Sequence, residues 1–204
     1  MILVASKIER AERGEDRLAI EATDQGLLVV VADGAGGTGG GAQAAQAVCD
    51  AAVAAVRKQN TEGGSWSARL TEMDLALVKA GHGGLSTAVV AEVLDGQVVG
   101  ASVGDSCAWL VSLGEVSDLT ERQVRKPLLG SGSAEPVAFG PVPLRGRLLV
   151  GTDGLFKYAS RSRLASLTAE GSPEVAAAAL VEAVRLKSGQ FQDDVGVVVC
   201  EETG

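Results

Sequence analysis

Short apolar runs recur along the chain and are separated by residues that favour turns. They are rich in Val and Leu, and Gly, Asp or Ser bounds most of them, which is typical of β-strands. We therefore expect at least one sheet with a buried face. An Asp-Gly pair within residues 94–97 predicts a hairpin between two of the strands. The predicted strands cover residues 1–6, 18–22, 27–32, 86–94, 97–103, 107–112, 147–152 and 195–201.

Helical periodicity appears in three segments. Residues 41–60 and 67–79 each place apolar side chains on one face. A third helix is expected to begin after Ser172, a residue type that caps helices, and to end before Gly189. Residues 122–143 are rich in Pro and Gly and lack a clear period, so we expect a loop there, a surface connection by default and a lid as the alternative. Strands packed with helices outside them are the predicted arrangement.

The composition is that of a globular protein. Apolar residues make up 46% and charged residues 22% of the 204 residues, which suits a single domain spanning residues 1–204. The formal net charge is -8, and no run of Lys or Arg forms a basic patch interleaved with aromatic residues. We therefore expect no nucleic-acid partner.

Three features bear on location and on metal chemistry. The apolar start of the chain has no basic residue before it and charges close behind, so we expect neither a signal peptide nor a membrane-spanning helix. Cys49, Cys107 and Cys200 lie far apart in apolar surroundings, which favours buried thiols in the cytoplasm over disulfides. The one histidine, His82, and the absence of a Cys-x-x-Cys pair argue against zinc, so a metal would be held by oxygen.

Acidic residues are attached to the ends of several apolar runs. A buried ionised carboxylate costs several kcal/mol unless it is paired or bound to a metal. Any one of these residues could begin a turn, because Asp-Gly is a common hairpin signal. Their joint occurrence, with Gly directly after Asp33 and Asp153, is harder to attribute to turns alone. The acids are Glu15 and Asp16, Asp33, Asp105, Asp153, and Asp193 with Asp194.

If the strands lie side by side, these carboxylates gather at one end of the sheet, where like charges repel. Divalent cations remove that conflict, and carboxylate, carbonyl and water oxygens are the ligands that Mg²⁺ and Mn²⁺ prefer. Two such ions a few ångströms apart form a site for phosphoryl transfer or hydrolysis. Gly34 suits such a site, because a residue without a side chain lets its own carbonyl approach an ion.

Six short motifs spread over nearly the whole chain carry these acids. They are, in order, GEDRLAI, VVVADGAGG, GGLSTAVVAEV, VGDSCAWLV, LLVGTDGLFKY and QDDVGVVV. In this order they resemble the metal-dependent protein Ser/Thr phosphatases, the type 2C or PPM family. The resemblance implies an α+β fold, a four-layer α-β-β-α sandwich in which two mainly antiparallel β-sheets are flanked by helices.

The resemblance also implies a set of metal ligands and a reaction. Asp33 would bridge two Mn²⁺ or Mg²⁺ ions, the Gly34 carbonyl would bind one of them, and Asp153 and Asp193 would complete the protein ligands. A water bridging the ions would attack phosphorus directly as the Ser or Thr oxygen leaves, with no phosphoenzyme. The implied partner is a phosphorylated protein in a signalling pathway, with a Ser/Thr kinase or its targets.

Outer positions of the site are implied in the same way. Glu15 and Asp16 would act mainly through metal-bound water, and Asp105 together with Asp153 would hold a third ion. Lys157 lies where many members of the family have a further Asp that helps this third ion. We therefore expect the third ion to bind weakly.

The chain departs from the family pattern where the phosphate-binding arginine is usually found. That position is Ala11, and its neighbour Arg10 is our candidate for binding the substrate phosphate. Gly196 replaces the usual Ser or Thr of the last motif, which is expected to loosen the end of that strand.

Two alternatives remain open. A degenerate, weakly active or inactive member could act as a phosphoprotein-binding or regulatory module, which Ala11, Lys157 and Gly196 favour and the retained acids disfavour. A nucleotide-binding loop formed by GAGGTGGG, residues 34–41, is weaker, because this run lacks the Lys and Ser/Thr of a P-loop.

Overall fold

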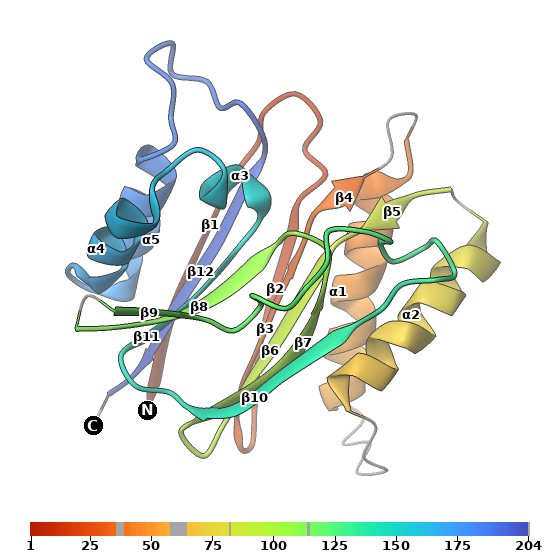
Figure 1. The fold of residues 1–204 in the computed structure, drawn as a ribbon, viewed down its shortest axis with the longest axis horizontal. Coiled ribbons are helices and arrows are strands. Elements are labelled where there is room, and N and C mark those ends of the chain that lie inside the picture. Colours follow the sequence, from red (N-terminus) through yellow and green to blue (C-terminus); the bar gives the residue numbers. More distant parts are fainter. Residues whose placement is uncertain (36–38, 58–64, 82, 114, 204) are drawn as a thin grey trace.

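Two five-stranded antiparallel sheets face each other at the centre of the protein (Figure 1). The computed structural model describes residues 1–35, 39–57, 65–81, 83–113 and 115–203. The first sheet has the order β1 (Ile2–Glu9), β12 (Val195–Glu202), β11 (Arg147–Gly151), β8 (Cys107–Ser112) and β9 (Glu115–Asp118). The second has the order β10 (Val137–Pro143), β7 (Gln97–Val103), β6 (Ala88–Leu94), β3 (Gly26–Ala32) and β2 (Arg17–Thr23).

Helices cover the outer face of each sheet and complete four layers. α1 (Gly41–Arg57) and α2 (Trp66–Ala80) pack on the second sheet, and α4 (Arg161–Ala169) and α5 (Pro173–Glu182) on the first. The short helix α3 (Asp153–Phe156) and the short pair β4 (Gly34–Ala35) and β5 (Leu85–Ser86) lie at the end of the sandwich away from the chain termini (Figure 1). The predicted four-layer α+β sandwich is confirmed.

The apolar run of β3 is continuous because both of its faces are buried. Leu27, Val29 and Val31 point into the core between the two sheets. The residues that alternate with them, such as Val30, pack against α1 and α2 on the other face. Asp33 therefore follows directly from a strand that is fixed by packing on two sides.

β10 shows that the expectation of a loop over residues 122–143 was wrong for the last part of that segment. The strand pairs with β7 at an edge of the second sheet, and its register shifts between Phe139 and Val142. Pro141 lies in this shift, and an irregular edge strand tolerates a proline because its ladder does not need every N–H. The prolines that predicted a loop are compatible with a strand in this setting.

Other differences concern short elements and element ends. The hairpin at Asp95 and Gly96 is confirmed, with φ of 49° and 71° at these residues. α5 ends at Glu182, earlier than the sequence suggested, and residues 58–60 of the first predicted helix lie outside the described part of the chain. The sequence pattern missed β9 and α3, which have 4 residues each, and α4, which has 9 residues and little separation between an apolar and a polar face.

Two expectations from composition can be compared with the structure. Within the described ranges, no helix combines the length and the apolar character needed to cross a membrane. All three cysteines are free thiols, of which Cys49 and Cys200 are buried and Cys107 is partly buried.

Candidate metal centre

The backbone of Asp33 is held by a neighbouring strand and does not form a hairpin. Its N–H donates to Thr87 Oγ1 at 3.0 Å, and its carbonyl accepts the N–H of Thr87 at 2.8 Å. Gly34 then pairs with Ser86 between β4 and β5. A Cβ on Gly34 would collide with the backbone of Gly41, so glycine is needed for α1 to begin this close. These contacts fix the position from which the Asp33 carboxylate projects.

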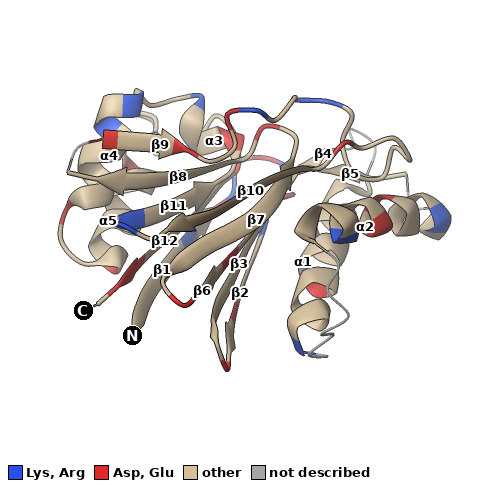
Figure 2. Cartoon of the chain, turned by 60° about the horizontal axis from the view of Figure 1, so that its bottom comes forward, with Lys and Arg blue, Asp and Glu red and all other residues tan. Residues whose placement is uncertain are grey.

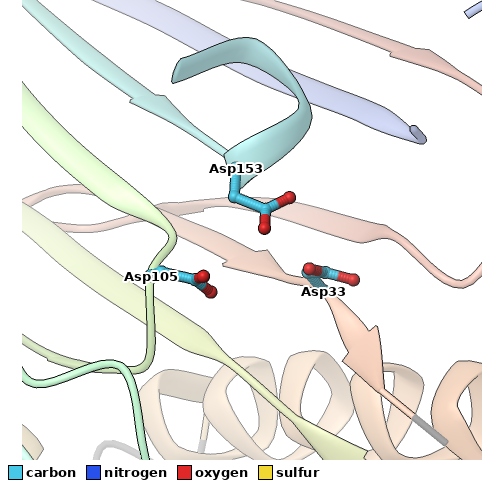
Figure 3. A group of neighbouring side chains, drawn as sticks. All are labelled: Asp33, Asp105 and Asp153. Atoms are coloured by element: carbon cyan, nitrogen blue, oxygen red, sulfur yellow. The ribbon is translucent and has the colours of Figure 1, made fainter. Parts of the chain in front are cut away.

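Three carboxylates from separate elements meet at this end of the sandwich. Asp33 follows β3, Asp105 follows β7, and Asp153 begins α3 after β11. One oxygen from each lies within 4.8 Å of the others, and Figure 3 shows the three side chains around a common space. The structure therefore brings together residues that the sequence separates by more than a hundred positions.

The early acidic pair divides between two environments. Asp16 is only 2% exposed, and its carboxyl group interacts with the carboxyl group of Asp33 and with the Thr152 hydroxyl. Its Oδ2 has no hydrogen-bond partner in the described structure. The carboxylate of Glu15 instead lies against the start of α1, where a Cβ on Gly41 would approach Glu15 Oε1 to 2.5 Å. Asp16 thus extends the cluster, and Glu15 lies beside it.

Asp193 and Asp194 have different surroundings although they are adjacent. Asp193 is close enough to contribute to the raised pKa of Asp33. The carboxylate of Asp194 accepts two backbone N–H groups, from Ala11 at 2.7 Å and from Glu15 at 2.5 Å. Asp194 therefore fixes the connection between β1 and β2, a structural role that its place in the sequence did not reveal.

Three acids of this cluster, Asp16, Asp33 and Asp153, have raised pKa values. Burial, with repulsion from Asp33, raises the pKa of Asp16 to about 9. Burial, with repulsion from Asp153, raises the pKa of Asp33 to about 7. Burial also raises the pKa of Asp153, although its ion pair with Lys157 acts in the opposite direction. The protein alone therefore does not fully neutralise the negative charge of these carboxylates. Oxygen ligands, among them the buried Asp16 Oδ2 without a hydrogen-bond partner, fit a divalent cation.

Two side-chain cations contact the cluster from its outer side. Lys157 Nζ lies against Asp153 Oδ2, one helical turn along the chain. Arg125 donates to Asp105 Oδ2 from Nε at 3.0 Å and from Nη2 at 2.6 Å. The sequence drew attention to Lys157, but it placed Arg125 only within a segment expected to be a loop.

A cleft of about 510 Å³ opens over the three carboxylates. Thr87 lines it and also holds Asp33, and its hydroxyl lies 2.7 Å from the hydroxyl of Ser106. Thr87 is not among the site residues predicted from the sequence, although a polar residue directly before the buried run of β6 is a signal that could have found it. The described lining comprises Asp33, Ala35, Thr87, Asp105, Arg125, Lys126, Leu128 and Asp153.

Several predicted features lie away from the cluster. Arg10 is exposed, its side chain lies over Gly14, and no described contact joins it to the acids. Gly196 does not loosen its strand as expected, since its N–H donates to Thr152 Oγ1 at 2.9 Å and its carbonyl accepts the Thr152 N–H at 3.0 Å. His82 and residues 36–38 of the glycine-rich run lie outside the described residues.

A comparison with protein-family models identifies the family of this chain. The model described as Stage II sporulation protein E (SpoIIE) matches residues 23–202, a range that contains Asp33, Asp105, Asp153 and Asp193. The chain belongs to the SpoIIE family. No curated protein matches the sequence of this SpoIIE-family chain significantly.

Solved structures share the fold of this SpoIIE-family chain. The Ser/Thr phosphatase Stp1 from Staphylococcus aureus has 20% identity and a TM-score of 0.82 over 100% of this chain and 96% of that chain. The Mycobacterium tuberculosis phosphatase PstP/Ppp has 21% identity and a TM-score of 0.81 over 100% and 99%. The PstP catalytic domain in complex with two manganese ions has 22% identity and a TM-score of 0.78 over 98% and 97%. These structures confirm the fold that the resemblance to the metal-dependent Ser/Thr phosphatases implies.

Proposed function

We propose that this SpoIIE-family chain is a metal-dependent phosphatase that hydrolyses phosphoserine and phosphothreonine in proteins. The observation that carries the proposal is the meeting of Asp33, Asp105 and Asp153 within 4.8 Å at the base of an open cleft. The phosphatase names of structures with the same fold, one of them holding two manganese ions, support it. We further propose that residues 1–204 act as one catalytic domain.

The residues that would hold two Mn²⁺ or Mg²⁺ ions are Asp33, Asp153 and Asp193, with the Gly34 carbonyl. Such ions, when bound, neutralise the carboxylates and the phosphoryl oxygens and acidify a water that serves as nucleophile. Asp16, whose pKa burial raises to about 9, would release its proton as the site fills. Thr87 would keep the Asp33 backbone in place throughout, through its two hydrogen bonds.

Direct attack without a phosphoenzyme is the reaction that we propose. The chain's thiols are poor nucleophiles, since burial raises the pKa of Cys107 to about 11 and that of Cys49 to about 12. Glu15 and Asp105 would act at the edge of the site, through water and through a weakly held third ion. A phosphorylated protein is the proposed substrate, and a Ser/Thr kinase as its counterpart and a cytoplasmic location remain predictions.

One observation favours the alternative of a phosphoprotein-binding module. Lys157 already occupies one oxygen of Asp153, and Arg10, the predicted phosphate ligand, has no described contact with the acids. A module of this kind would bind phosphopeptides or metal without turnover. Calorimetric titration with Mn²⁺ beside a turnover assay separates the two functions.

The test is hydrolysis of p-nitrophenyl phosphate and of a phosphothreonine peptide in Mn²⁺, in Mg²⁺ and in EDTA. We expect phosphate release from both substrates with metal and none with EDTA. No phosphate release in any condition, from protein that is shown to be folded by a cooperative thermal transition, would contradict the phosphatase activity and favour the binding module. Equal activity in EDTA would contradict the metal dependence.

A further inference from the structure

The segment between β9 and β10 forms one side of the cleft. We call residues 119–136 the cleft wall. Leu129 joins the cleft wall to Ser86 through two backbone hydrogen bonds of 3.0 Å each. Ser86 is adjacent to Thr87, which holds Asp33, so the cleft wall is tied to the same short stretch of backbone as the central carboxylate.

A buried aspartate of α2 holds the next part of the cleft wall. Asp74 is 2% exposed, and its carboxylate accepts three backbone N–H groups. The donors are Gly130 at 2.6 Å, Gly132 at 3.0 Å and Ala134 at 3.0 Å. A carboxylate satisfied by three amides fixes the backbone strongly, because a hydrogen bond to a charged group is worth more than one between neutral groups. The cleft wall is therefore an ordered part of the site.

The cleft wall contributes two basic side chains to the lining of the cleft. Arg125 and Lys126 both line it, and the Arg125 side chain is 70% exposed. Nε and Nη2 of Arg125 share one oxygen of Asp105, and its Nη1 has no partner among the residues described. Basic and acidic residues lie close together at the end of the sandwich that holds α3, β4 and β5 (Figure 2).

We propose that Arg125 binds the phosphoryl group of the substrate, with Asp105 as the residue that orients its guanidinium. A phosphorylated side chain entering this cleft meets Asp33, Asp105 and Asp153, and it needs a donor that is permanently charged. The planar fork of arginine matches phosphate oxygens, and the outer edge of Arg125 faces open space. This assignment rests on the proposed function and gives to Arg125 the role that the sequence had suggested for Arg10.

The test compares Arg125→Ala and Arg125→Lys with Arg122→Ala, which removes an exposed arginine of the same cleft wall that makes no described contact. KM and kcat for a phosphothreonine peptide are measured at saturating Mn²⁺, with the inhibition constant of inorganic phosphate. Loss of a charged hydrogen bond predicts that Arg125→Ala raises KM and the phosphate inhibition constant by about tenfold or more, with smaller changes for Arg125→Lys. The Arg122→Ala control is expected to match the wild type.

Mn²⁺ titration of the same variants separates phosphate binding from simple neutralisation of Asp105. A change in Mn²⁺ affinity for Arg125→Ala, with KM and the phosphate inhibition constant unchanged, would overturn the proposal. Anisotropy of a labelled phosphothreonine peptide, with its unphosphorylated form as control, gives a readout that does not require turnover. If the protein shows no turnover but its peptide binding depends on Arg125, the result would contradict the proposed phosphatase activity and support phosphate binding by Arg125. If binding does not depend on the phosphate group, both the proposed activity and the role of Arg125 would be overturned.

Discussion

The ammonium group of Lys157 contacts the carboxylate of Asp153 across one turn at the end of α3. Lys157 is 39% exposed at its side chain, whereas the side chain of Asp153 is 10% exposed, so the cation approaches the acid from the solvent side. A positive charge in this position competes with a metal ion for one of the two oxygens of Asp153. The acidic cluster is therefore partly compensated before any metal binds.

Removing this cation should strengthen metal binding. We expect Lys157→Ala to bind Mn²⁺ roughly three- to tenfold more tightly, as for the loss of about 1 kcal/mol at a partly exposed ion pair. The measurement is calorimetric titration, with Lys187→Ala, an exposed lysine without a described contact, as the control for net charge. Equal Mn²⁺ affinity of Lys157→Ala and the wild type would show that the ion pair does not restrain the site.

The stability of the metal-free protein should fall as pH rises. Asp16 and Asp33 bind a proton more tightly in the folded protein than in the unfolded chain, since burial raises their pKa values to about 9 and about 7. The folded state keeps this advantage below the ordinary pKa of aspartate and loses it as pH rises through the folded values. We therefore expect the Tm in EDTA to be lower at about pH 8 than at about pH 6.

Mn²⁺ should reverse this trend. Metal ligands must be deprotonated, so the increase in Tm on adding Mn²⁺ should be larger at about pH 8 than at about pH 6. Asp16→Asn removes one buried charge, and it should raise the metal-free Tm at the higher pH and reduce the Mn²⁺-dependent increase. Thermal denaturation by circular dichroism checks both, and a metal-free Tm that rises with pH would contradict the assigned electrostatics.

Asp74 should stabilise the protein through the cleft wall. Asp74→Ala leaves three backbone N–H groups without their acceptor, and we expect a loss of roughly 2–3 kcal/mol in the free energy of unfolding. Glu72→Ala, an exposed residue of the same helix, is the matched control. Urea denaturation gives the energies, and hydrogen exchange should become faster at Gly130, Gly132 and Ala134. Exchange that is unchanged at these amides would contradict an anchoring role.

The central strands and the acids at their ends could be predicted from the sequence. β3 lies between two packed layers, so its apolar run is unbroken and the carboxylate at its end stands out. The other Asp-Gly pair, Asp95 and Gly96, forms a real hairpin with positive φ. Asp33 and Gly34 do not have positive φ, and Asp33 is held by Thr87 of a neighbouring segment. The hydrophobic periodicity could not distinguish these two Asp-Gly pairs, whereas the joint occurrence of acids at several strand ends could.

The outer part of the site depends on contacts between distant segments. Arg125 meets Asp105 only because Asp74 and Ser86 hold the cleft wall in place, and no local pattern encodes those bonds. The same holds for Asp194, whose bonds to the β1–β2 connection span about 180 residues along the chain, 183 to Ala11 and 179 to Glu15. Sequence spacing identified the acids but did not identify what positions them.

Phosphate release by Asp33→Asn tests the central claim most directly. Asp33 is held through its backbone, so the variant should fold, and the measurement is hydrolysis of a phosphothreonine peptide in Mn²⁺. Asp95→Asn, in the true hairpin, is the control and should keep wild-type activity. We predict that Asp33→Asn loses roughly a hundredfold or more of the metal-dependent rate, because a carboxylate that would hold the metal ions is gone. A rate that equals the wild type in a folded Asp33→Asn protein would contradict the proposed metal centre.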